Sequence, residues 1–206
     1  MQINLPSGLE NSLIWWPERG MGFHPAPAIQ YDGDYFESYI QRDRTQMGVA
    51  LTDARIGLVT KYTSLENVVD IGIGGGRFVH DAGCRGYDVN ESAVTWLRNH
   101  GWFCSPYASP VFAVTCWDSL EHIDKPWKLL KQVERFLFVS LPTFRDHADV
   151  LSSKHYKPGE HVWYWTSKGL IEWCAEHGFI VREVNTMESD LGREGITSFV
   201  FEREQS

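Results

Sequence analysis

The sequence has 206 residues, a formal net charge of −8 at pH 7, and 43% hydrophobic and 22% charged residues. This length suits one globular domain, expected over residues 1–206, and the composition excludes a chain too polar to bury a core. The basic residues form no run, so nonspecific binding to a nucleic-acid backbone is disfavoured. Four cysteines without CxxC spacing, no basic-then-apolar leader and no stretch long enough to span a bilayer predict a cytoplasmic protein.

The N-terminal part, residues 1–62, is expected to form an arm followed by two lid helices, ahead of a core over residues 63–206. Residues 1–33 are rich in proline, glycine and large aromatic residues, which favours turns and extended pieces over a long helix. Charged and apolar residues then recur at helical spacing. The helices expected there span 34–47 and 51–62, with Asp34 and Thr52 as N-caps.

Beyond residue 66, short apolar runs alternate with helical segments, which implies a parallel sheet covered by helices. Little room for a crossover helix separates the last two strands, so the last strand is expected to be antiparallel. The predicted fold is α/β, a seven-stranded mixed sheet with helices on both faces. The expected strands are 67–71, 84–88, 111–117, 136–141, 179–184 and 196–202, and the expected helices are 77–82, 91–100, 126–134 and 166–178.

The strongest motif is the segment from Asp70 to Gly76, which reads Asp-Ile-Gly-Ile-Gly-Gly-Gly between a predicted strand and a predicted helix. Glycines there let the backbone turn sharply and approach a ligand closely, and the amides of the following helix face it. A dinucleotide-binding fingerprint would need a third glycine at position 77, where the chain has Arg77. The spacing therefore favours a nucleotide-like ligand other than NAD.

A second acid, Asp88, ends the next predicted strand, where a carboxylate can accept hydrogen bonds from both hydroxyls of a ribose. The alternative is an ordinary strand-to-helix turn, with Asp88 as the N-cap of the next helix. The combination of strand, acid, glycine turn and second acid favours the ligand-binding interpretation.

These motifs resemble those of the class I S-adenosylmethionine (AdoMet) dependent methyltransferases, whose first motif is an acid followed by GxGxG and whose second is an acid ending the second strand. The resemblance covers residue 67 to the C-terminus and implies a Rossmann-like sheet. The segments 116–123 and 139–142 are similar to the family's fourth and fifth strands. The segment 159–179 is similar to the ubiquinone-biosynthesis-type O-methyltransferase branch.

The resemblance implies AdoMet as the cofactor and assigns residues to each part of it. The glycine turn would hold the methionine part, the second acid and its neighbour the ribose, and residues 105–108 the adenine, while the end of the fourth strand would close the pocket. The implied cofactor-binding residues are Asp70, Gly72, Gly74, Gly76, Asp88, Val89, Tyr107, Trp117 and Asp118.

Methyl transfer from a sulfonium mainly requires two positioned reactants and exclusion of water. A hydroxyl acceptor would benefit from a base, and His122 and His161 are the catalytic candidates because both follow strands at the carboxyl edge of the sheet. A packing role is the alternative for His122. The candidates for acceptor binding are His24, Tyr31, Arg55 and Trp163, although the aromatic residues of the arm could equally be packing.

No HExxH, GxSxG or Walker motif occurs, and metal dependence is not expected. The predicted function is AdoMet-dependent methylation of an oxygen, or alternatively a nitrogen, of a small molecule. Two other functions stay open: a catalytically silent AdoMet-binding or partner-binding subunit, and a nucleic-acid methyltransferase guided by another subunit. The sequence does not identify the acceptor or the oligomeric state.

Overall fold

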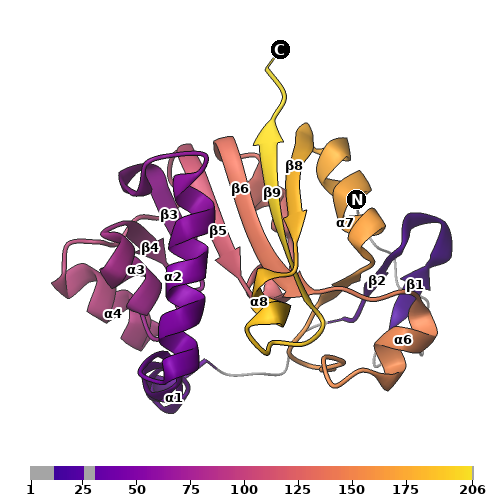
Figure 1. Ribbon diagram of the computed structural model, residues 1–206, viewed down its shortest axis with the longest axis horizontal. Helices are drawn as coiled ribbons and strands as arrows, with labels where there is room; N and C mark the ends of the chain where they lie inside the picture. The colour runs from indigo at the N-terminus through magenta and orange to yellow at the C-terminus, as the bar shows by residue number, and fades with distance from the viewer. Residues whose placement is uncertain (1–11, 26–30, 206) are drawn as a thin grey trace.

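The computed structural model describes residues 12–25 and 31–205. Its centre is a six-stranded sheet in the order β4-β3-β5-β6-β9-β8 (Figure 1). Strands β3 to β6 pair in parallel, and β9 pairs antiparallel with both β6 and β8, as expected for the last strand. The strands are β3 (Val68–Ile71), β4 (Arg85–Tyr87), β5 (Val111–Trp117), β6 (Val133–Pro142), β8 (Phe179–Asn185) and β9 (Ile196–Arg203).

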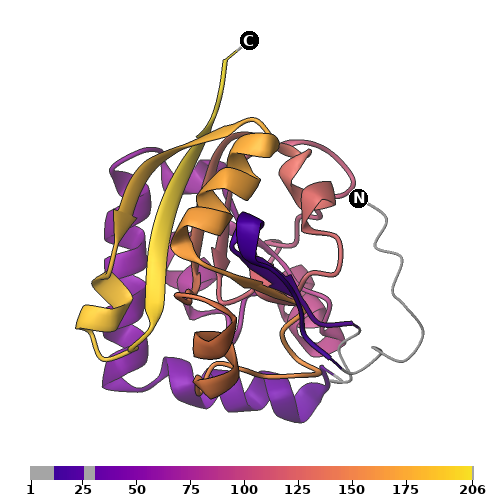
Figure 2. The ribbon, with the colours of Figure 1, turned by 90° about the vertical axis from the view of Figure 1, so that its right-hand side faces the viewer.

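Helices cover both faces of this sheet, and Figure 2 shows α2 and α7 on opposite sides of it. Side chains alternate between the faces: Val69 packs with α5 and α7, whereas its neighbour Val68 packs with the helices α1 to α4. The predicted fold class is therefore confirmed. The helices are α1 (Gly33–Asp43), α2 (Gln46–Thr60), α3 (Arg77–Ala82), α4 (Glu91–Asn99), α5 (Pro126–Leu130), α6 (His147–Ser152), α7 (Ser167–Glu176) and α8 (Met187–Asp190).

A small antiparallel sheet joins the N-terminal arm to the second half of the chain. Strand β2 (Met21–Phe23) pairs with β1 (Ile14–Trp16) on one side and with β7 (Trp163–Trp165) on the other. All three residues of β7 are buried. The extended pieces expected in the arm are thus strands of a sheet whose third member is far away in the sequence.

The described sheet has six strands rather than the predicted seven, and the segment between α4 and β5 forms no strand beside β4. It makes a single bridge, between Gly86 and Phe103, before Pro106 interrupts the segment. The predicted helix 126–134 is also too long, since α5 ends at Leu130 and β6 already begins at Val133.

The two lid helices begin earlier than predicted. Asp32, not Asp34, caps α1 by accepting a hydrogen bond from the Tyr35 amide, and Thr45, not Thr52, caps α2. Thr52 lies inside α2, where its hydroxyl donates to the Gly48 carbonyl. The side chains of both caps accept a hydrogen bond from an amide of the first turn, from Tyr35 in α1 and from Gly48 in α2, which fixes where each helix begins.

Candidate functional site

The glycine turn follows β3 and has backbone angles that favour glycine. Gly72 and Gly76 have φ of 74° and 86°. A Cβ on Gly72 would lie 2.8 Å from the Cβ of Ser119, and one on Gly76 would lie 2.8 Å from the ring of Trp96. Asp70 lies beneath the turn and accepts a hydrogen bond of 2.6 Å from Thr115. Burial raises the pKa of Asp70 to about 7.

Asp88 points toward this turn from the end of β4. Its Oδ2 accepts a hydrogen bond from the Ile73 amide at 2.9 Å, and its Oδ1 accepts one from the Asn90 amide at 2.8 Å. Each carboxylate oxygen has a second lone pair that these contacts leave free. Burial raises the pKa of Asp88, and the backbone amides oppose that shift.

A cavity of about 730 Å³ extends along the carboxyl ends of β3, β4, β5 and β6. Val89, predicted for the ribose, and Tyr107, predicted for the adenine, lie on its rim, since they are 69% and 40% exposed. The predicted site residues that line the cavity are Tyr31, Arg55, Asp70, Gly72, Gly74, Asp88, Val89, Tyr107, Trp117, Asp118, His122 and His161.

The remaining three predicted residues do not line the cavity. Gly76 caps the start of α3 behind the turn. Trp163 is 3% exposed, and its indole N–H donates to the carbonyls of Ile123 and Asp124. His24 is 5% exposed, with Nδ1 at 3.2 Å from the Pro25 carbonyl oxygen. Both side chains are buried outside the lining of the cavity, and their role in acceptor binding stays a prediction.

Helix α1 brings aromatic side chains over the cavity. The Tyr35 hydroxyl donates to the Tyr39 hydroxyl at 3.1 Å, and the ring of Tyr31 packs edge-on against Tyr35 at 5.0 Å. Asp43, at the end of α1, accepts a hydrogen bond from the Arg77 amide. The first amide of α3, which was expected to face a ligand, is therefore bonded to the lid.

The two catalytic candidates lie side by side at the other end of the cavity. The rings of His122 and His161 are 4.7 Å apart and nearly perpendicular. The Val162 amide donates to the Glu121 carbonyl at 2.8 Å, which holds the two loops together. Burial lowers the pKa of both rings, and that of His161 falls to about 2, so both are neutral at pH 7.

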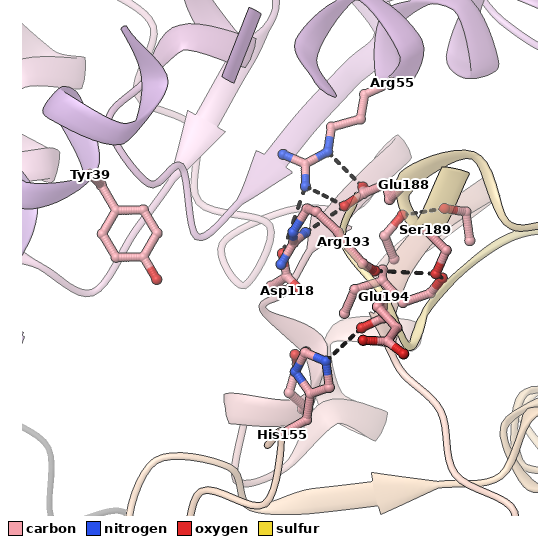
Figure 3. A network of polar contacts seen from close by, with 12 residues as sticks. Tyr39, Arg55, Asp118, His155, Glu188, Ser189, Arg193 and Glu194 are labelled. Atoms are coloured by element: carbon pink, nitrogen blue, oxygen red, sulfur yellow. Dashed lines mark hydrogen bonds and ion pairs between the residues drawn. The ribbon is translucent and has the colours of Figure 1, made fainter. Parts of the chain in front are cut away.

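Arg55 and Asp118 belong to a network of buried charges at the cavity wall (Figure 3). Arg55 donates to Glu188 through Nε at 2.8 Å and through Nη2 at 3.0 Å, and Arg193 bridges Glu188 and Asp118. Burial works to raise the pKa of Asp118, but its pairing with Arg193 and Arg55 holds that pKa below the usual value.

Sequence reasoning missed Glu188 and Arg193. Glu188 is fully buried, although it stands in a polar stretch, Asn185 to Glu194, that has no apolar periodicity. An acid in such a stretch gives no local sign of burial, because its partner Arg55 is supplied by α2 from the other half of the chain. Tyr35 and Tyr39 of α1 belong to the aromatic residues for which the sequence left binding and packing open, and both line the cavity.

Comparisons with known proteins agree with this geometry. A family model described as a methyltransferase domain matches residues 41–184. Similar solved structures include the magnesium protoporphyrin IX methyltransferase of Synechocystis with bound SAH (TM-score 0.57, 15% identity, 81% of this chain and 88% of that one). A possible histamine N-methyltransferase of Thermotoga maritima has a TM-score of 0.58 at 15% identity, over 84% and 99% of the chains.

A third similar structure is the putative methyltransferase of Haloferax volcanii in complex with the Trm112 methyltransferase activator (TM-score 0.62, 13% identity, 84% of this chain and 97% of that one). No curated protein matches the chain. Among the described residues, no helix combines the length and apolarity needed to cross a membrane.

The fold and the cavity therefore define an AdoMet-dependent methyltransferase of class I. The chain belongs to the family of methyltransferase domains whose model covers residues 41–184. The predictions of enzyme class and of cofactor are confirmed at this level, whereas the roles of individual residues stay predictions.

Proposed function

We propose that this protein transfers the methyl group of AdoMet to an oxygen of a small-molecule acceptor. The observation that carries the proposal is the continuous cavity that joins the glycine turn and Asp88 at one end to His122 and His161 at the other. A donor and an acceptor bound at these two ends would lie in one enclosed space, as an in-line displacement requires.

The residues at the donor end fit AdoMet. The two amide contacts of Asp88 leave a lone pair on each carboxylate oxygen for the ribose hydroxyls, and Gly72 and Gly74 line the cavity without side chains that would fill it. When bound there, AdoMet supplies a methyl group on a sulfonium, whose sulfur takes the bonding electrons and leaves as the thioether. Asp70, Asp88, Val89, Tyr107, Trp117 and Asp118, with the glycines of the turn, are the proposed binding residues.

At the acceptor end, polar side chains face the cavity. The Tyr31 hydroxyl lies 3.2 Å from Nδ1 of His122, and burial raises the pKa of Tyr31 to about 12, so the phenol keeps its proton at pH 7. An acceptor hydroxyl that displaced the Tyr31 hydroxyl would lie beside the neutral rings of His122 and His161. A ring nitrogen of either histidine can accept a hydrogen bond from it. Arg55, which the sequence predicts to bind the acceptor, forms ion pairs with Asp118 and Glu188. Its role in this proposal is to hold these two carboxylates in place.

The proposal also covers the acceptor atom, the location of the protein and its domain organisation. The similarity of residues 159–179 to the ubiquinone-biosynthesis-type branch supports oxygen over nitrogen as the acceptor atom. The four free cysteines, three of them buried, support a cytoplasmic location. Pairing of the arm with β7 supports one domain over residues 1–206, with residues 1–62 as arm and lid.

The proposal predicts which ligands protect the protein against heat. AdoMet and S-adenosylhomocysteine should each raise the melting temperature, because both would occupy the glycine turn and Asp88, whereas NAD should not. A thermal-shift series with the three ligands measures this. Protection by NAD alone would overturn the interpretation of the turn.

A second candidate is a partner-dependent methyltransferase, favoured by the Haloferax protein's complex with an activator. AdoMet would then bind, but a broad screen of hydroxylated acceptors would release no S-adenosylhomocysteine. Methyl labelling of RNA or DNA only in the presence of a second subunit would identify the nucleic-acid version of this candidate, and small-molecule turnover by the isolated chain would exclude it.

A further inference from the structure

We propose that Glu121, His122 and His161 bind a divalent transition-metal ion at the acceptor end of the cavity. Each of the three side chains offers one ligand atom, and these atoms all lie within 4.8 Å of one another. No zinc-protease motif occurs in the sequence, which therefore predicts no dependence on a metal. No sequence motif groups the three residues, because His161 lies in a different loop from Glu121 and His122. Folding brings the two loops together.

The carboxylate of Glu121 is the observation that points to a cation. Glu121 is 2% exposed, and neither of its oxygens has a hydrogen-bond partner among the described residues. Nε2 of His122 lies 3.9 Å from Oε1, beyond hydrogen-bonding distance. Burying a carboxylate without a partner raises the free energy of the folded state. Buried carboxylates are therefore normally paired with another group or bound to a metal ion.

The backbone holds these three groups in place. Glu121 and His122 lie in a short 3-10 turn, Leu120–His122, that directly follows β5. The Val162 amide bonds to the Glu121 carbonyl, and the Trp163 indole bonds to the Ile123 carbonyl at 3.1 Å. Trp163 therefore supports the site from behind, which gives this buried tryptophan a positioning role.

The ligand set selects the kind of ion. Two imidazoles and one carboxylate suit Zn²⁺, Mn²⁺, Fe²⁺ or Co²⁺, whereas Mg²⁺ and Ca²⁺ prefer oxygen ligands alone. Asp118 and Glu160 add negative charge beside His122, while Lys157 adds positive charge.

Three protein ligands leave coordination positions open toward the cavity, which is the arrangement of catalytic sites. This inference rests on the proposed function for its consequence: an acceptor hydroxyl bound to the ion would lose its proton to solvent water more readily, which would prepare the oxygen for methylation. His122 would then be a metal ligand rather than the base.

The test is a titration of the untagged, metal-depleted full chain with Co²⁺, followed by visible absorption and by NMR of the histidine rings. We expect one Co²⁺ per chain and shifted signals from two histidines. Glu121→Gln and His161→Gln should each weaken binding at least about 100-fold, because even outer-shell partners change metal affinity by about 10–100-fold.

His80→Gln and Glu172→Gln, exposed residues outside the cavity, serve as matched controls and should keep the wild-type spectrum. Absence of Co²⁺ binding by the wild type, or equal binding by the Glu121 and His161 variants, would overturn the site. The Asp88→Ala variant separates the two proposals, since it should lose AdoMet binding but keep the Co²⁺ spectrum.

Discussion

Asp88→Ala is expected to abolish the thermal protection that AdoMet gives. The carboxylate would accept hydrogen bonds from the ribose hydroxyls in a half-buried position, beside its contact with the Ile73 amide. Hydrogen bonds to a charged group contribute about 1.5–3 kcal/mol each, so losing two would cost about 3 kcal/mol or more. That loss corresponds to a dissociation constant weakened by more than about 100-fold, measurable by isothermal titration calorimetry.

Two further variants make this result specific. Asp88→Asn keeps one oxygen acceptor and should weaken AdoMet binding less than alanine does. Asp53→Ala, on the exposed side of α2, should bind like the wild type. Circular dichroism verifies the fold of each variant. An alanine variant that is folded and binds AdoMet as the wild type does would show that the ribose contact has been misassigned.

Glu188→Ala is expected to destabilise the protein strongly. Glu188 is fully buried and pairs with two arginines, so its removal leaves two partly buried guanidinium groups that share Asp118 as a counter-charge. Breaking a buried ion pair in this way typically costs about 3–5 kcal/mol. For a chain of this length the melting temperature should fall by roughly 6–20 °C.

Urea unfolding of Glu188→Ala beside Glu172→Ala measures the difference. Glu172 forms an exposed ion pair with Lys168 on α7, and exposed pairs contribute about 0–1 kcal/mol. Equal effects of the two substitutions would mean that the network of Arg55, Glu188 and Arg193 does not hold α2 to the C-terminal part of the chain.

The sequence alone predicted most of the core because its elements have local boundaries. Helix α3 has the predicted bounds, since Gly76 and Gly83 bracket it with positive φ. Strand β5 also matches its prediction, Val111–Trp117, as a run of apolar and β-branched residues. His122 and His161 were both expected at the carboxyl edge of the sheet, and their rings do meet there because the loops after neighbouring strands share that edge.

What the sequence could not predict depends on contacts between distant residues. The arm strands are only three residues long, and β2 finds its second partner, β7, about 140 residues later. No local pattern reveals such a pairing. Glu121 stands beside His122 in the sequence, but its lack of a hydrogen-bond partner is visible only once the loop carrying His161 has packed against it.

The small sheet of β1, β2 and β7 has a consequence for how this enzyme can diversify. The donor end of the cavity is built on the large sheet, whereas the loop carrying His161 leads directly into β7 of the small one. The His24 amide donates to the Val162 carbonyl, so the arm also anchors that loop. We therefore expect mutations in the arm to change the proposed acceptor end of the cavity while the proposed donor end stays intact.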